Sequence, residues 1–425
     1  MINLKSEIVK GFATTSFFGV ITKLITVLVT LYCSNMLAPD EFGEFGYLKN
    51  TLDIIIMICA ANFTSLAIKF AAESMTSDKS LRRLYILVFF TLSVSFLATL
   101  IITIIPSGTL DVFFDNSSIT HYIKVLGLLL PIFIVYPLVC AILRGYKEFT
   151  IVGAYETSVS TVYLLLIIVG VYLFKGKGAI YALFSFHFIA SLVGVLIVYH
   201  YNKHKSYLIK VSSIESENKC AISMILPVFL MSFIEAPLQW LGQTEVAKNG
   251  SYALVGCLTV IVQVRYVIQM LPSFFYSSFT SFVSILNAQR RHQEYFGKFT
   301  RLFKILVLMS VVLVSLLVLF GKFILGLFND IYIEYYNSYL LSLLSVPLLL
   351  LAAMYKLNMM VKEHQRGMLY MSIICSLLFI LFLYAFIALG LNVLDAFFLA
   401  QFVQFGSQCL IGWTFFSRDK KTVYK

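Results

Sequence analysis

Charged residues are scarce in this chain. Only 12% of its 425 residues are Asp, Glu, Lys or Arg, whereas 60% are hydrophobic and the mean hydropathy is +0.90. A soluble protein carries about twice that charged fraction. Water is therefore excluded as the main solvent, and the composition predicts a membrane protein.

The sequence also lacks the motifs of most enzymes and metal proteins. It contains no G-x-x-x-x-G-K-[ST] phosphate loop, no zinc motif and no G-x-S-x-G elbow. Its seven cysteines form no C-x-x-C pair and mostly lie inside apolar runs, so we interpret them as small packing residues. We expect no enzyme, no cofactor, no metal site and no ATP hydrolysis by this chain.

A cleavage site of the A-x-A type is absent from the N-terminal segment MINLKSEIVKGFATTSFFGV. Lys5 and Lys10 are similar to the positive region of a signal peptide, but the apolar run continues to about Met36. We therefore interpret this segment as an uncleaved first membrane span.

Long apolar runs dominate the rest of the chain. A helix needs roughly 20 apolar residues to cross the hydrocarbon core, and lipid leaves unpaired backbone groups unsatisfied. Because the runs are too long for barrel strands, they predict an all-α polytopic protein of about twelve spans. The runs cover residues 12–36, 46–72, 84–105, 120–143, 153–174, 179–201, 220–244, 251–271, 302–325, 337–360, 367–390 and 395–416.

The net charge of +11 is distributed unevenly. With a cytoplasmic N-terminus, 22 of the 32 basic residues fall in inside segments, and the outside loops hold only Lys175, Lys177, Lys248 and Lys322. The positive-inside rule then predicts that both termini are cytoplasmic. The same asymmetry explains the basic balance without a nucleic-acid partner.

The longest inside loop divides the spans into six and six. We predict an N-terminal lobe at 1–201, a cytoplasmic linker at 202–219 and a C-terminal lobe at 220–425. A displacement of 216 residues superposes Pro131 on Pro347, and similar displacements align other segments of the two halves. A duplication with an even number of spans relates the lobes by an axis along the membrane normal and places a substrate path between them.

Some charged residues lie close to span ends. A lysine at such a position can extend its ammonium group to the interface. A structural rather than a functional role is therefore favoured for these residues, which are Lys69, Lys124, Lys356, Glu156 and Asp395. His187 lies deeper. It is either a neutral buried imidazole with a structural role or a functional group, and both alternatives remain.

Four charged residues lie deeper: Lys23, Asp53, Glu235 and Arg265. A charge at mid-bilayer costs at least ~2.5–3.5 kcal/mol. Lys23 belongs to a polar stripe on the first span, together with Ser16, Gly19, Thr26 and Thr30. Glu235 belongs to a similar stripe on the seventh span, together with Ser232, Gln239 and Gly242. On the eighth span, Gln269 follows Arg265 by one turn. The alternatives are a structural ion-pair network between helices and a water-filled central cavity, and the stripes favour the cavity.

Lys49 and Asp53 are separated by one helical turn at the start of the second span. At this spacing the two side chains can neutralise each other. The pair is either a polar mouth of the cavity or a local salt bridge.

Several motifs resemble those of the Wzx-type oligosaccharide flippases, in the multidrug/oligosaccharidyl-lipid/polysaccharide (MOP) exporter superfamily. LAPDEFGEFGYLKN after the first span is similar to that family's L-x-P-x-x-[FY]-G-x-[FY] turn. SLRRL at 80–84, AILRGYKEF at 141–149 and LPSFFYSSFTSFVSILNAQ at 271–289 resemble its basic loop, its loop after span 4 and its proline-broken end of span 8.

The resemblance implies two six-helix lobes that expose a central cavity alternately to each side. The implied substrate is an undecaprenyl-diphosphate-linked oligosaccharide, moved across the bacterial inner membrane for O-antigen or related lipopolysaccharide and polysaccharide biosynthesis. As further partners, the resemblance implies a polysaccharide polymerase and a chain-length regulator. Arg265 occupies the place of a recurrent cation in span 8, and Arg265 and Lys23 are the expected ligands of the diphosphate.

Two other functions compete with a flippase. A cation-coupled multidrug exporter of the same superfamily would favour a cavity of carboxylates and aromatic rings, whereas this chain has as many deep cations. A membrane polysaccharide polymerase generally has a long outside loop, which is lacking here. If an ion gradient drives transport, Glu235 is preferred as its carrier over Asp53, because Lys49 should hold Asp53 ionised.

Overall fold

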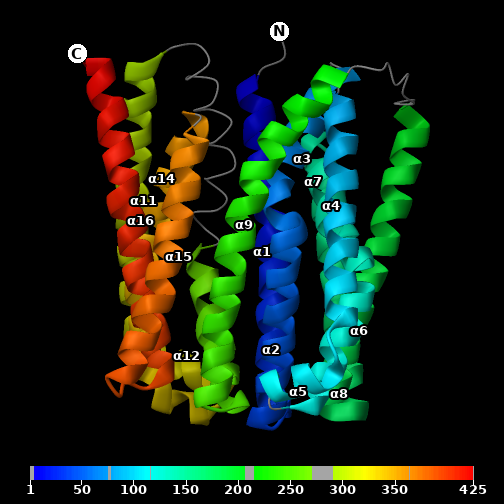
Figure 1. Ribbon diagram of the computed structural model, residues 1–425, viewed down its shortest axis with the longest axis vertical. Coiled ribbons are helices and arrows are strands. Elements are labelled where there is room, and N and C mark those ends of the chain that lie inside the picture. Colours follow the sequence, from blue (N-terminus) through cyan, green and yellow to red (C-terminus); the bar gives the residue numbers. More distant parts are fainter. Residues whose placement is uncertain are drawn as a thin grey trace. The chain divides into compact units, whose positions relative to one another are not determined.

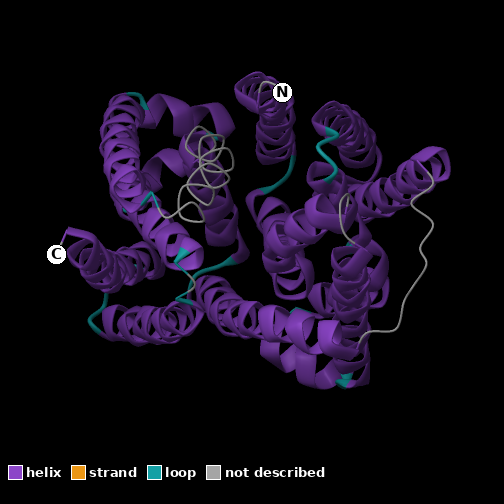
Figure 2. Cartoon of the chain, turned by 90° about the horizontal axis from the view of Figure 1, so that it is seen from above, coloured by secondary structure: helices purple, strands orange, loops and turns teal. Residues whose placement is uncertain are grey.

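The computed structural model describes residues 4–74, 78–114, 116–205, 215–269, 291–362 and 364–424 (Figure 1). Helices make up almost all of these residues, and no strand occurs among them (Figure 2). The predicted all-α class is confirmed. A helix pairs its backbone groups within one segment, which is the condition that lipid imposes on a chain this apolar.

The chain divides into two compact units, Met1–Ala236 and Pro237–Lys425. The division falls inside one helix, α9 (Glu215–Asn249), rather than in the basic segment before it. Residues 206–214 of that segment, and the 271–289 motif, lie outside the described residues. The lobe boundaries read from the sequence stay a prediction.

Unit 1 begins with a long helix and continues through a second span that is interrupted once. Its elements before α9 are α1 (Leu4–Met36), α2 (Pro39–Ile56), the π-helix η1 (Met57–Ala61), α3 (Asn62–Ser74), α4 (Asp78–Ile104), α5 (Ser107–Phe114), α6 (Ser117–Phe133), α7 (Val135–Gly145) and α8 (Phe149–Lys205). Because α2, η1 and α3 follow one another directly, the second span bends without a loop.

Helix α8 contains two spans joined at Lys175, whose φ of 53° and ψ of −133° are not helical. Gly170 and Gly178 lie on the two sides of this break. A Cβ at Gly178 would lie 1.8 Å from the Gly170 carbonyl oxygen, so only glycine permits the two helices of this hairpin to approach so closely.

Unit 2 contains the end of α9 and a helix over Tyr252–Gln269. Its further elements are α11 (His292–Leu319), α12 (Gly321–Phe328), the 3₁₀-helix η2 (Asp330–Tyr335), α13 (Tyr336–Leu344), α14 (Val346–Val361), α15 (Gln365–Ala388) and α16 (Val393–Tyr424).

Ten helical segments of the described chain are long and apolar enough to cross a membrane. One of them, Phe149–Tyr201, counts as two spans once it is divided at Lys175. The bent segment α2–η1–α3 is a further one, so the described helices account for the twelve spans that the sequence predicts.

The two units repeat the same succession of elements. A long helix (α4 or α11) leads to a helix of 8 residues (α5 or α12) and then to a broken span (α6–α7 or α13–α14). Pro131 precedes the break at Ile134, and Pro347 follows the break at Ser345. Proline lacks the amide N–H of a helix interior, so the two aligned prolines lie where both spans are interrupted.

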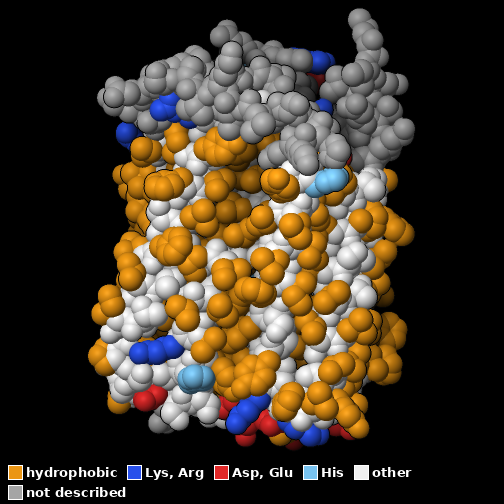
Figure 3. Space-filling model, turned by 90° about the vertical axis from the view of Figure 1, so that its right-hand side faces the viewer, with side chains coloured by type: hydrophobic (Ala, Val, Ile, Leu, Met, Phe, Trp, Pro, Cys, Tyr) orange, Lys and Arg blue, Asp and Glu red, His pale blue; other side chains and the backbone are white. Residues whose placement is uncertain are grey.

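The outer surface of the helices is apolar. Phe89 is 74% exposed and Leu196 is 65% exposed, as expected for side chains in contact with lipid. On the face shown in Figure 3, hydrophobic side chains cover the middle height, and charged side chains gather towards the two ends.

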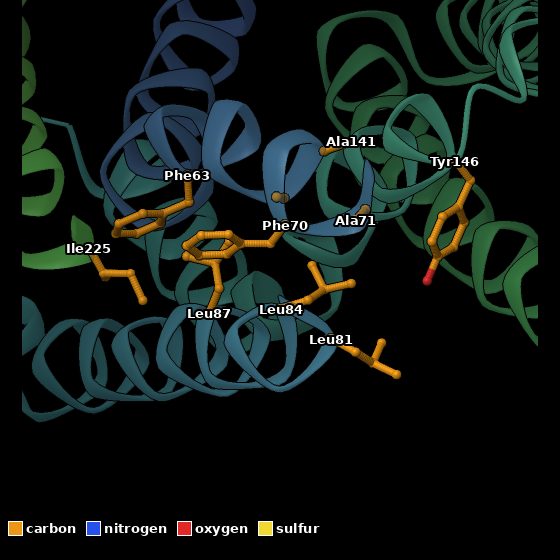
Figure 4. Close-up of a cluster of buried hydrophobic side chains, with 10 residues drawn as sticks. Phe63, Phe70, Ala71, Leu81, Leu84, Leu87, Ala141, Tyr146 and Ile225 are labelled. Atoms are coloured by element: carbon orange, nitrogen blue, oxygen red, sulfur yellow. The ribbon is translucent and has the colours of Figure 1, made fainter. Parts of the chain in front are cut away.

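The interior of unit 1 contains a hydrophobic cluster that includes Phe63, Phe70, Leu84 and Leu87 (Figure 4). Ile225 of α9 joins this cluster, and the ring of Phe63 stacks on that of Phe229 with centroids 6.3 Å apart. The first half of α9 therefore packs as part of unit 1. This packing explains why the boundary between the two units lies within α9, after Ala236.

A polar network lies at the ends of α14 and α16 in unit 2. Asp419 accepts hydrogen bonds from Asn358 Nδ2 at 3.2 Å and contacts His364 Nε2 at 2.9 Å, and Tyr295 donates to Asn358 at 2.8 Å. Burial lowers the pKa of the neighbouring Lys362, and the charge of Asp419 partly opposes this. The network joins four helices at one end of the unit.

Candidate functional site

The polar stripe predicted on the first span lies on α1 and is not uniformly buried. Lys23 is exposed and Thr30 is buried. Thr26 and Thr30 donate to the carbonyl oxygens of Thr22 and Thr26 at 2.9 and 3.1 Å, so their hydroxyl hydrogens are satisfied by their own helix. Lys23 is therefore the exposed charge of the stripe.

Lys49 and Asp53 form the salt bridge that their spacing predicts. The Nζ atom of Lys49 lies 2.9 Å from Asp53 Oδ2 on α2. The side chain of Asp53 is 56% exposed, whereas that of Lys49 is 19% exposed. The carboxylate of Asp53 is thus the more exposed group of the pair, and the ammonium of Lys49 is the more buried one.

Lys23 lies within electrostatic range of both members of this pair and of Glu156. Three helices, α1, α2 and α8, thus contribute to one charged group in unit 1. Glu156 itself accepts a hydrogen bond from Arg144 Nη2 at 2.5 Å, and both side chains are partly buried. The weaker candidate Glu156 therefore has a structural partner that accounts for its burial.

His187 is buried among the aromatic rings of α6, α7 and α8. Its ring lies 5.3 Å from that of Phe133 and 4.8 Å from that of Phe186. The Nδ1 atom is buried and has no hydrogen-bond partner in the described part of the chain. The charge of Asp53 reaches the imidazole, so His187 adjoins the charged group of unit 1.

Arg265 is buried in unit 2, with 6% of its surface exposed. Its Nη1 atom donates to Gln401 Oε1 at 2.6 Å, its guanidinium lies 6.0 Å from the ring of Phe398, and its Nε has no partner among the described residues. Gln269, one turn later, also has a buried amide nitrogen, Nε2, without a partner there. A full positive charge is thus held by a neutral amide.

The polar stripe of the seventh span lies on α9. Ser232 and Glu235 are buried, and Gln239 is partly exposed. A buried carboxylate is the type of group whose protonation responds to its surroundings. The role of Glu235 as an ion carrier stays a prediction.

The remaining candidates are near the surface. Lys69 is exposed, and Lys124, Lys356 and Asp395 are partly exposed. Asp395 accepts a hydrogen bond from Ser338. Their structural or functional role stays a prediction.

The structure brings some of the candidates together within one unit. Lys23, Lys49, Asp53, Glu156 and His187 belong to one neighbourhood of unit 1, whereas Arg265 and Gln269 belong to unit 2. Among the described residues, no group of three or more His, Cys, Asp and Glu side chains is arranged to hold a metal ion.

Two partners escaped the sequence reasoning. Arg144 belongs to the segment that the sequence predicts as the loop after span 4, but it lies in the last turn of α7 and pairs with Glu156. Gln401 is a neutral residue 136 positions from Arg265, and no periodicity connects them.

No protein-family model matches this chain, and no curated protein matches it.

Solved structures do match, over nearly the whole chain. An inward-facing multidrug resistance MATE family transporter of the MOP superfamily has a TM-score of 0.75 and 15% identity, covering 94% of this chain and 96% of that chain. A MOP superfamily transporter from Pyrococcus furiosus has a TM-score of 0.71 and 16% identity, covering 97% and 96%. A MATE in complex with MaL6 has a TM-score of 0.71 and 17% identity, covering 98% and 97%. The chain therefore has the all-helical, two-lobe membrane fold of the MOP superfamily transporters.

Proposed function

We propose that this protein is a flippase for an undecaprenyl-diphosphate-linked oligosaccharide repeat unit. It moves the substrate from the cytoplasmic to the periplasmic leaflet of a bacterial inner membrane by alternating access, and serves O-antigen or related surface-polysaccharide biosynthesis. The transporter fold supports the transport part of this proposal. The resemblance of the motifs to Wzx-type flippases supports the substrate, and a polysaccharide polymerase and chain-length regulator are the partners it implies.

The buried charge of Arg265 carries the proposal. No carboxylate of the described residues pairs with Arg265. The titratable group that interacts electrostatically with Arg265 is the Tyr266 phenol. The segment 270–290 that follows contains no Asp or Glu either. A buried cation without a counter-charge is unfavourable by several kcal/mol, so an anionic ligand would stabilise it.

A diphosphate suits this requirement. Guanidinium donors bind phosphate oxygens through two parallel hydrogen bonds, and the partnerless Nε leaves one donor of Arg265 available. Lys23 supplies a second cation, exposed on α1 of unit 1. The two residues belong to different units, so a substrate that contacts both in turn would couple binding to the exchange of conformations.

Export of a cationic drug is the second candidate, since the inward-facing neighbour is a multidrug resistance transporter. For the Pyrococcus furiosus transporter, a reversed polarity of the binding pocket suggests a different function. Pocket polarity is therefore the property to examine here. A cationic drug would be repelled by an uncompensated Arg265, which favours the anionic substrate.

Flipping of a fluorescent undecaprenyl-diphosphate oligosaccharide in proteoliposomes tests the proposal. Arg265→Ala should lower the rate at least tenfold, and Arg265→Lys should restore it only in part, because an ammonium group cannot bind bidentately. Lys322→Ala, which removes an exposed lysine of α12, is the matched control. Full flipping by Arg265→Ala, or export of cationic dyes without lipid flipping, would contradict the proposed function.

A further inference from the structure

Unit 1 contains an open pocket between α1 and the first span of α8. Its volume is about 400 Å³, and it is lined by Phe18, Ala154, Thr157, Ser158 and Thr161. This volume lies within the range of small-molecule sites, roughly 300–1,000 Å³. None of the lining residues is charged, and three of the five carry a hydroxyl group.

The hydroxyl groups are held in place by the two helices. Thr22 and Thr157 share a hydrogen bond of 3.1 Å between their Oγ1 atoms, which joins α1 to α8 beside the pocket. Thr161 donates to the Thr157 carbonyl oxygen at 2.9 Å. A hydroxyl that donates once keeps two acceptor lone pairs, and Ser158 forms no hydrogen bond within the described part of the chain. The pocket therefore offers both acceptors and a donor.

The aromatic wall of the pocket depends on a glycine. A Cβ at Gly153 would lie 2.3 Å from Cδ2 of Phe18, so the ring packs directly on the α8 backbone. Ala154 follows with another small side chain, which leaves the space in front of the ring open. A flat apolar ring beside fixed hydroxyls forms an amphipathic surface.

The pocket lies within the membrane-spanning part of α8. Ser158 lies nine residues after the start of α8, which is roughly 14 Å along the helix, and five residues inside the apolar run that begins at residue 153. Ser158 and Thr161 are exposed at this depth, and Leu165, which follows Ser158 by two turns on the same face of α8, is exposed as well. The Thr161 hydroxyl is satisfied by its own helix, whereas a hydroxyl without a hydrogen bond, as at Ser158, is unfavourable inside a membrane unless water or a polar ligand contacts it.

We propose that this pocket binds a sugar residue of the transported substrate. The inference rests on the proposed function and adds a second recognition site to it. A sugar has hydroxyl groups that match Thr157, Ser158 and Thr161 and an apolar face that matches the ring of Phe18. The absence of charge among the lining residues fits a neutral glycan, and Lys23, next to Thr22 on α1, lies beside the pocket where an attached diphosphate would be stabilised.

Saturation-transfer NMR on the protein in nanodiscs tests the pocket with free neutral hexoses, 6-deoxyhexoses and N-acetylhexosamines. At least one sugar should receive saturation from the wild type. Ser158→Leu fills the pocket and should raise the Kd for that sugar at least tenfold. Thr161→Val removes one hydroxyl at nearly constant shape and should raise the same Kd severalfold. Ser185→Leu is the matched control, because Ser185 is an exposed serine of α8 outside the pocket.

A second measurement separates the pocket from the proposed function. Binding of undecaprenyl diphosphate without sugar should depend on Arg265 and be unchanged in Ser158→Leu. If this lipid binds but no sugar does, or if both pocket variants bind sugar as the wild type does, the pocket assignment is overturned and the flippase proposal stands. If sugar binds and the diphosphate lipid does not, the flippase proposal fails and the pocket stands.

Discussion

Arg265 donates a hydrogen bond from Nη1 to Oε1 of Gln401 across 2.6 Å, and this bond connects the Tyr252–Gln269 helix with α16. The acceptor is neutral, so it orients the guanidinium without cancelling its charge. An anionic ligand that displaced Gln401 would gain the attraction of a nearly desolvated cation. Gln401 is therefore a positioning residue for Arg265.

Replacement of the amide by a carboxylate should lock Arg265. We expect Gln401→Glu to form a buried ion pair with the guanidinium and to reduce the binding of undecaprenyl diphosphate at least tenfold, with little loss of thermal stability. Gln404→Glu is the control, because Gln404 is equally buried on α16 but does not bond to Arg265. Lipid binding and the melting temperature of purified protein provide the two readouts. Wild-type lipid binding by Gln401→Glu would show that Arg265 does not contact the phosphate.

Removal of the hydrogen bond alone should act on stability. Gln401→Ala leaves a buried charged donor without its acceptor, a change that costs about 1.5–3 kcal/mol. The melting temperature should therefore fall in Gln401→Ala, whereas the exposed change Lys322→Ala should leave it unchanged. An unaltered melting temperature in Gln401→Ala would mean that Arg265 finds another acceptor.

The contact between Arg144 and Glu156 predicts a stability effect in unit 1. Glu156→Ala should destabilise the protein by about 1–3 kcal/mol, because the pair is partly buried and its Arg144 would lose a charged acceptor. The exchanged double variant Arg144→Glu, Glu156→Arg should recover part of this loss. Thermal unfolding in detergent measures both. Equal stability of Glu156→Ala and wild type would show that the pair contributes nothing.

The charge asymmetry predicts the orientation of the loops. Cysteines introduced at Lys175 or Lys177 should be labelled by a membrane-impermeant maleimide from the periplasm, and cysteines at Lys203 or Lys210 should be labelled only from the cytoplasm. The measurement needs a background without the native cysteines. Labelling of either loop from the opposite side would contradict cytoplasmic termini.

Glu235 is the predicted carrier of a coupled ion. A carboxylate buried on α9 can bind a proton or a cation, and the loss of its charge would change which conformation is favoured. In proteoliposomes with an imposed pH or sodium gradient, wild-type flipping should respond to one gradient, and Glu235→Gln should not. Asp53→Asn is the comparison, since Asp53 is exposed and paired with Lys49. A gradient response in Glu235→Gln equal to that of wild type would exclude the coupling role.

The sequence by itself determined the helical class, the number of spans and the Lys49–Asp53 pair. These features follow from local chemistry: long apolar runs require helices in lipid, and residues four apart on a helix are neighbours. The prolines that the sequence aligned as evidence of a duplication also lie at the interrupted spans of both units, because a missing amide hydrogen acts on its own helix.

The tertiary structure alone decided which polar residues meet. Gln401 and Arg265, Arg144 and Glu156, and Thr22 and Thr157 are brought together by packing between helices, and apolar spans of similar composition do not encode which faces will touch. The pocket beside Phe18 arises in the same way, because its walls come from α1 and α8 and its shape from the contact of Phe18 with Gly153. Periodicity indicates that a helix has a polar face, whereas only the packed structure shows what that face binds.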